Sequence, residues 1–142
     1  MTIITAKALE VKELLRVVVV RNRRFKAAEF RLRPGERGLS LFARVHDPGP
    51  EEIIAAVEAM GKQGDLAIAV LPAEGIVSLG LRLVRTPGGT GRAELDDIHY
   101  EARLPAWRQL ILGIQGQSAA DYFNERYSRS LFELAQVLDR EA

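Results

Sequence analysis

His99 and Glu101 are spaced so that an imidazole and a carboxylate could carry out acid–base chemistry. The segment 95–104 around them is predicted to be a strand, in which alternate side chains point to the same face. A carboxylate beside an imidazole can orient it as a general base, although a routine exposed pair on a sheet has the same spacing. No nucleophile can be assigned, because Ser40 lies on another predicted strand at a distance that the sequence does not fix.

A second candidate site is a segment rich in arginine, interleaved with Phe25 and Phe30. Guanidinium groups bind phosphates bidentately, and aromatic rings can stack on bases. The segment therefore predicts an anion-binding or nucleic-acid-binding surface, and a solvated or salt-bridged surface is the alternative. The chain as a whole carries a net charge of only +1, whereas nucleic-acid-binding domains are usually strongly basic. The predicted anion-binding residues are Arg21, Arg23, Arg24, Arg31 and Arg33.

The charge is unevenly distributed along the chain. Residues 16–44 hold eight arginines and one lysine against two glutamates, a net charge of +7, so the remainder carries −6. Such asymmetry marks either a face that binds an anion or two parts that neutralise each other in the fold.

Several kinds of site are disfavoured by composition. The chain has no cysteine and two histidines, so we predict no metal site and no cofactor. The glycine-rich loop at 87–91 lacks the context of a phosphate-binding Walker or Rossmann loop and is predicted to join two strands. The longest apolar run, at 17–20, is far shorter than the roughly 20 residues of a membrane span. We therefore expect a cytoplasmic protein that does not enter the membrane.

The elements that must position these residues alternate between helices and strands. Four consecutive β-branched residues at 17–20 favour a buried strand. Apolar spacing and turn residues predict the rest. The fold predicted for 1–142 is one α/β or α+β domain, with a mixed sheet of about five strands. Helices are expected at 5–15, from Pro50, at 72–79, from Pro105 and at 118–141, and strands at 16–21, 38–45, 66–71, 81–86 and 95–104.

The last predicted helix begins at Ser118, a favourable N-cap residue. Its apolar residues form one stripe about 120° wide, which is expected to pack on the core. The stripe leaves over two aromatic residues, Tyr122 and Phe132, which are either incidental or the contact for another chain. A symmetric homo-oligomer is the simplest assembly that would use them.

Two resemblances add to these predictions. The stretches 30–42, 80–87 and 99–101 resemble a group of small, uncharacterised bacterial proteins, which implies a bacterial origin and no particular activity. The order of Arg, Ser and Glu on successive strands is similar to that of ADP-ribosyltransferase folds, including toxins. That similarity implies that Arg21 or Arg24, Ser40 and Glu101 contact a nicotinamide dinucleotide. The Ser-Thr-Ser and Glu-x-Glu strings of that family are missing from this chain.

Three functional hypotheses follow. The first is an interaction protein that self-associates or binds a protein partner through its C-terminal helix and basic N-terminal part. The second is a small enzyme that uses His99 and Glu101 on one strand face. The third is nucleic-acid binding through the arginine-rich segment 21–33.

Overall fold

The centre of the molecule is a six-stranded sheet in which every neighbouring pair of strands is antiparallel. The structure is a computed structural model that describes residues 11–88 and 90–138. The strand order is β4-β5-β2-β1-β3-β6. The strands are β1 (Glu13–Val19), β2 (Gly38–Ala43), β3 (Leu66–Pro72), β4 (Arg82–Arg85), β5 (His99–Arg103) and β6 (Gln136–Val137).

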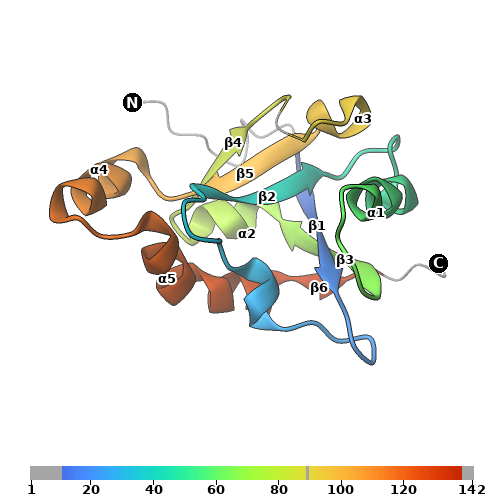
Figure 1. Ribbon diagram of the computed structural model, residues 1–142, viewed down its shortest axis with the longest axis horizontal. Helices are drawn as coiled ribbons and strands as arrows, with labels where there is room; N and C mark the ends of the chain where they lie inside the picture. The colour runs from blue at the N-terminus through green and yellow to red at the C-terminus, as the bar shows by residue number, and fades with distance from the viewer. Residues whose placement is uncertain (1–10, 89, 139–142) are drawn as a thin grey trace.

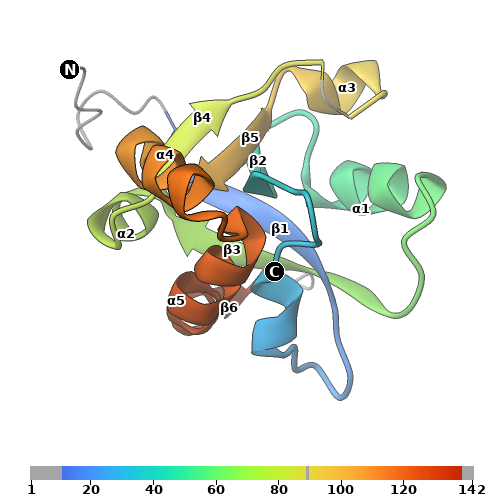
Figure 2. The same cartoon turned by 60° about the vertical axis from the view of Figure 1, so that its left-hand side comes forward.

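Helices cover both faces of the sheet, as Figures 1 and 2 show. Side chains of β1 alternate between the two resulting cores, because successive residues of a strand point to opposite faces. The helices are α1 (Pro50–Ala59), α2 (Ala73–Ser78), α3 (Ala93–Asp96), α4 (Ala106–Gln115), α5 (Ala119–Leu134) and the 3₁₀ helix η1 (Ala27–Phe30). Leu14 and Val18 pack with α2, α4, α5 and η1, whereas Leu15 and Val17 pack with α1 and α3.

The predicted α+β fold and its long C-terminal helix are confirmed, with differences in detail. The sheet has six strands and every pair is antiparallel. The helix that begins after the Ser118 cap ends at Leu134, and the chain then extends to add β6 at the edge of the sheet.

Two local predictions are wrong. A helix was expected over 5–15, but Glu13–Leu15 belong to β1, where pairing with β2 and β3 on both sides outweighs local helix propensity; residues 5–10 lie outside the described residues. The strand expected at 95–104 begins only at His99, because Ala93–Asp96 form the short helix α3.

The sheet opens at its middle, between β1 and β2. These two strands share only two register pairs, Leu14 with Ala43 and Leu15 with Phe42. Each has a longer pairing on its other side: β1 with β3 from Glu13 to Val19, and β2 with β5 from Gly38 to Phe42. In Figure 1 the two strands diverge beyond their shared pairs. The divergence leaves a wedge that polar side chains occupy.

Candidate functional site

A cleft of about 680 Å³ opens where β1 and β2 separate. Its walls come from both strands, from the segment between η1 and β2, and from the end of α1 with the turn after it. The residues with polar or charged side chains in its lining are Arg16, Arg31, Arg33, Glu36, Ser40, Lys62, Thr90 and His99. The cleft therefore combines groups that the sequence separates by up to 83 positions.

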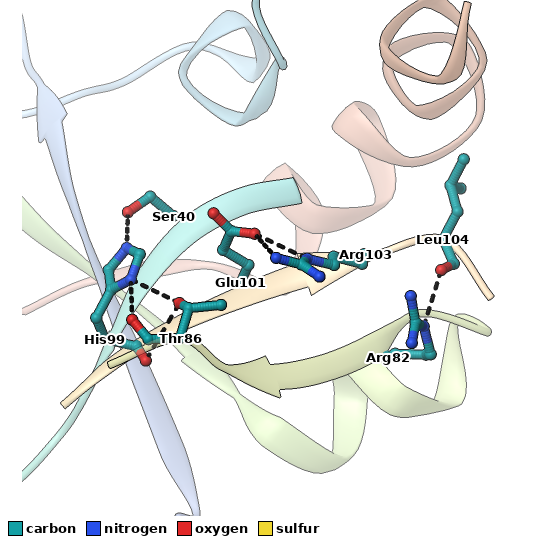
Figure 3. Close-up of polar contacts among 7 residues, drawn as sticks. All are labelled: Ser40, Arg82, Thr86, His99, Glu101, Arg103 and Leu104. Carbon is teal, nitrogen blue, oxygen red and sulfur yellow. Dashed lines mark hydrogen bonds and ion pairs between the residues drawn. The ribbon is translucent and has the colours of Figure 1, made fainter. Parts of the chain in front are cut away.

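Ser40 and His99 form a hydrogen-bonded pair at this cleft. The register places Ser40 opposite Glu101 and Phe42 opposite His99, so Ser40 and His99 are diagonal neighbours on one face of the sheet. The distance from Ser40 Oγ to His99 Nε2 is 2.5 Å. Figure 3 shows the two side chains pointing toward each other. The His99 side chain is buried, and its ring lies 5.5 Å from that of Phe42.

The contacts of the other ring nitrogen of His99 bear on the direction of this hydrogen bond. Nδ1 lies 3.1 Å from the Thr86 carbonyl oxygen and 2.6 Å from Thr86 Oγ1. A carbonyl can only accept, so the tautomer with the hydrogen on Nδ1 satisfies it. In that neutral tautomer Nε2 is the acceptor, and the Ser40 hydroxyl donates to it. This hydrogen bond polarises the Ser40 hydroxyl and holds it in one orientation.

Glu101 is held by Arg103 rather than by His99. The Arg103 guanidinium contacts Glu101 Oε1 through Nε at 2.8 Å and Nη2 at 2.7 Å. Both contacts are to the same oxygen, and Oε2 has no protein partner within the described part of the chain. Since the nitrogens of His99 are bonded to Ser40 and Thr86, the carboxylate is not what orients the imidazole. Glu101 instead lies directly across from Ser40 in the strand register, on the same face.

Arg16 brings a cation into the interior end of the cleft. Its Nε donates to the Glu29 carbonyl at 2.6 Å, and its Nη1 donates to the Ser40 carbonyl at 2.8 Å. Burial lowers the pKa of this guanidinium to about 10, against the opposing effect of Glu29 and Glu36. The group stays charged at neutral pH, at a cost in desolvation. A guanidinium has five N–H groups, so Arg16 keeps donors for a ligand beyond the two that these carbonyls take.

Lys62 adds a second partly buried cation. Its Nζ donates to the Val17 carbonyl at 2.8 Å and lies 3.7 Å from Glu29 Oε1. Burial lowers the pKa of the Lys62 ammonium, and the nearby positive charges of Arg16 and Arg33 lower it further. The cations of the cleft thus repel one another, and a bound anion would relieve that repulsion.

The lining of the cleft is electropositive as a whole. Its charged members are three arginines and one lysine against Glu36 alone, a net charge of +3. Glu36 Oε1 accepts the backbone N–H of Arg33 at 2.5 Å, which ties the acidic side chain to its own turn. The arrangement favours an anionic ligand with more than one negative charge.

The glycine-rich loop contributes one residue to the cleft. Thr90 donates its backbone N–H to Asp96 Oδ1 at 3.0 Å and its hydroxyl to the same oxygen at 2.5 Å. These bonds lower the pKa of the Asp96 carboxyl. They also fold the loop against α3, which places Thr90 at the edge of the cleft.

The structure divides the arginine cluster that the sequence predicts. Arg31 and Arg33 line the cleft. Arg21, Arg23 and Arg24 are exposed in a tight turn closed by backbone bonds between Arg21 and Arg24. Asn22 and Arg23 have φ angles of 54° and 62°, the left-handed pair that a two-residue turn of this kind requires.

The two aromatic residues of the predicted interface are partly buried. The Phe132 ring packs edge-on against Phe25 at 5.4 Å. The guanidinium carbons of Arg108 and Arg126 lie 5.2 and 5.3 Å from the centre of the Tyr122 ring. Neither is among the large side chains that the described surface exposes most.

The described residues hold no group of three or more His, Asp and Glu side chains that could bind a metal ion. No helix in residues 11–88 and 90–138 is long and apolar enough to cross a membrane.

Comparison of the chain with protein-family models, with curated proteins and with solved structures gives no significant match. Function is therefore inferred from the geometry of the cleft.

Sequence reasoning missed four residues of this arrangement: Arg16, Ser40 as the partner of His99, Lys62 and Thr86. Arg16 could have been found from the sequence, because a lone charge inside the apolar run 14–20 needs a buried partner. Lys62 and Thr86 carry none, since each follows the end of an element and its contacts depend on the tertiary fold.

Proposed function

We propose that the cleft binds nicotinamide adenine dinucleotide and that the protein cleaves the bond between its nicotinamide and its ribose. The observation that carries this proposal is the meeting of three strands at one cleft. Arg16 from β1, Ser40 from β2 and His99 from β5 line the cleft. Glu101, also on β5, lies beside it, directly across from Ser40 in the strand register. The order Arg, Ser, Glu across β1, β2 and β5 is the one that the ADP-ribosyltransferase resemblance implies. Arg16 takes the place beside Ser40 for which the sequence offered Arg21 or Arg24.

The charge of the cleft supports a diphosphate as the recognised group. A dinucleotide carries two negative charges on adjacent phosphates, and the lining carries a net +3. Arginine forks and a lysine are the side chains that proteins commonly use for phosphates. A diphosphate placed among Arg16, Arg33 and Lys62 would also relieve the repulsion that lowers the pKa of Lys62.

The size of the cleft supports a ligand larger than a single phosphate. Its volume of about 680 Å³ lies within the roughly 300–1,000 Å³ of pockets for drug-sized molecules. Phe42, beside His99, offers an apolar wall for a planar ring. The diphosphate then lies among the cations, and the nicotinamide end lies toward Ser40.

Glu101 and Ser40 supply the chemistry in this proposal. Cleavage breaks the bond between ribose C1′ and the nicotinamide nitrogen, and its electron pair neutralises the pyridinium ring. The positive charge that develops on the ribose is stabilised by a carboxylate, as in glycoside hydrolysis. Glu101 Oε2 is that carboxylate oxygen, and the Ser40 hydroxyl orients the ribose. A water molecule then bonds to C1′ and loses its proton to Glu101, which passes it to solvent.

The binding step is tested by calorimetry with three ligands. The dinucleotide and ADP should both bind, because they share the diphosphate, whereas adenosine should bind at least tenfold more weakly. Arg33→Met and Lys62→Met should each weaken ADP binding about tenfold, the effect of losing one charge-assisted hydrogen bond. Arg24→Met is the matched control, since Arg24 is an exposed arginine outside the cleft, and it should leave binding unchanged. Equal losses in Arg24→Met and Arg33→Met would contradict the proposed site.

The cleavage step is tested separately by nicotinamide release. Glu101→Gln keeps the size of the side chain and should lower kcat at least 100-fold, while the affinity for ADP stays within about threefold. If the variant releases nicotinamide as fast as the wild-type chain, Glu101 has no part in the reaction. If the wild-type chain binds the dinucleotide but releases no nicotinamide, the binding proposal stands and the cleavage proposal fails.

Nucleic-acid binding remains a second candidate, because the exposed turn at 21–24 carries three arginines outside the cleft. This hypothesis predicts that Arg24→Met and Arg33→Met change places in the size of their binding loss. Arg24→Met should then weaken binding of a single-stranded oligonucleotide more than Arg33→Met, with affinity falling steeply as salt is added. The cytoplasmic location predicted from the sequence remains part of either proposal.

A further inference from the structure

One helix of the molecule turns its apolar side to the solvent. In α4 the exposed fractions are 57% for Trp107, 66% for Leu110, 37% for Ile111 and 77% for Ile114. The spacing i, i+3, i+4 and i+7 places these four side chains within about 100° of arc on the helix surface. Elsewhere such a stripe faces the core, as it does in α5. Large apolar side chains gathered in one exposed patch mark an interaction surface.

The inward side of α4 is the more polar one. Leu112 is the one residue of the helix that is buried, and the Arg108 guanidinium lies 4.4 Å from the centre of the Trp107 ring. Gln109 Nε2 is buried without a hydrogen-bond partner in the described structure. The largest apolar residues of α4 thus lie on its outer side, although burying them against α5 would make the isolated chain more stable.

We propose that the four outward residues of α4, Trp107, Leu110, Ile111 and Ile114, form the contact with a second copy of this chain. The patch is nearly symmetric about the midpoint between Leu110 and Ile111. Two α4 helices packed antiparallel about a twofold axis therefore place Trp107 of each copy near Ile114 of the other. An interface of this kind uses one self-complementary surface on both copies.

The area of the patch matches a weak dimer. With the roughly 200 Å² of a buried aromatic side chain as an upper value for each of the four residues, their exposed fractions give at most on the order of 500 Å² per copy. Two copies together then bury up to on the order of 1,000 Å², which is the lower limit for a specific interface. Interfaces of this size are typical of reversible association.

Charge also favours pairing with a second copy. The only charged residue of α4 is Arg108, which lies outside the arc of the four outward residues. Two such helices therefore meet little repulsion of like charges.

The test is sedimentation velocity of the full chain over a range of concentrations. The wild-type protein should reach twice the 15.7 kDa chain mass. Leu110→Glu with Ile114→Glu should remain at the single-chain mass, with an unchanged circular dichroism spectrum. Val45→Glu is the matched control, because Val45 is also exposed and lies outside α4, and it should still dimerise.

Four results would overturn the proposal. One is a wild-type chain that stays monomeric at the highest concentration. Another is a dimer that the double variant retains. A third is a monomer that floats with vesicles through α4, since the patch would then serve a membrane surface. The fourth is a chain that dimerises only after residues 1–10 are deleted, since the patch would then serve the chain's own N-terminal segment. The nucleotide assays do not depend on the outcome, because α4 supplies none of the residues that line the described cleft.

Discussion

The cleft between β1 and β2 and the outer side of α4 depart from ordinary protein architecture in opposite ways. The cleft brings cations into a partly buried site, where burial lowers the pKa of Arg16 and of Lys62. The helix leaves Trp107 and Ile114 in water. Buried charge and exposed apolar surface both have a cost for the isolated chain. In the two proposals each cost would be relieved by a ligand of matching chemistry, a diphosphate in the cleft and an apolar surface at α4.

The largest expected difference lies within α4 itself. Leu112 is 2% exposed and Ile114 is its exposed neighbour two positions on. Leu112→Ala should lower the free energy of unfolding by about 3 kcal/mol, because it leaves a cavity in the core. Ile114→Ala should change the free energy of unfolding of the monomer by less than about 0.5 kcal/mol and should still weaken the dimer. Urea unfolding at low chain concentration measures both, and equal losses would mean that Ile114 is buried within the chain.

A smaller effect is expected at Arg16. Arg16→Met deprives the carbonyls of Glu29 and Ser40 of their donors, and it also removes a charge that is costly to bury. The two effects oppose each other, so the free energy of unfolding should fall by only about 1–2 kcal/mol. ADP binding should be lost. Thermal unfolding with and without ADP separates the two, since the variant should show no ligand-induced rise in Tm. A rise equal to that of the wild-type chain would remove Arg16 from the site.

The smallest expected effect concerns pH. Because the pKa of Lys62 is lowered in the folded chain, its ammonium loses its proton at a lower pH than in the unfolded chain. Between those two pKa values the unfolded state binds more protons, so the contribution of Lys62 to stability rises with pH. ADP affinity should change in the opposite direction, falling as pH rises through the lowered pKa. Phosphate is fully ionised well above its second pKa of about 6, so the ligand's charge is constant there.

Lys62→Met provides the control for this pH profile. The variant should bind ADP more weakly at neutral pH and should lose the part of the alkaline decline that belongs to Lys62. Calorimetry at several alkaline pH values measures both chains. A variant whose affinity declines along the same profile as the wild-type chain would show that Lys62 does not contact the ligand.

Local pattern predicted the elements of this fold better than the site. The β-branched run at 17–20 and the stripe of α5 depend on neighbours in sequence, and both elements formed as expected apart from their ends. The contact of Ser40 with His99 depends on the register between β2 and β5, which no local pattern encodes. The helix from Pro105 was predicted from its apolar residues, yet the direction in which those residues face follows from how α4 docks on α5.

The tertiary fold also decides which of the predicted arginines line the cleft and which lie outside it. Arg24 and Arg33 are equivalent by sequence, each within an arginine-rich segment beside a phenylalanine or leucine. A tight turn directs the segment 21–24 outward, whereas the segment after η1 runs along the opening between β1 and β2. The separation of two central strands is a tertiary feature, and it decides which cations lie together in the cleft.

The most direct test of the cleft is the pattern of backbone amide shifts when ADP is titrated into the isotope-labelled chain. The shifts should concentrate at Arg33, Ser40 and Lys62, and they should spare the turn at 21–24 and the outer residues of α4. That result would place the diphosphate where β1 and β2 separate. Shifts confined to 21–24 or to α4, or the absence of shifts at saturating ADP, would contradict the account.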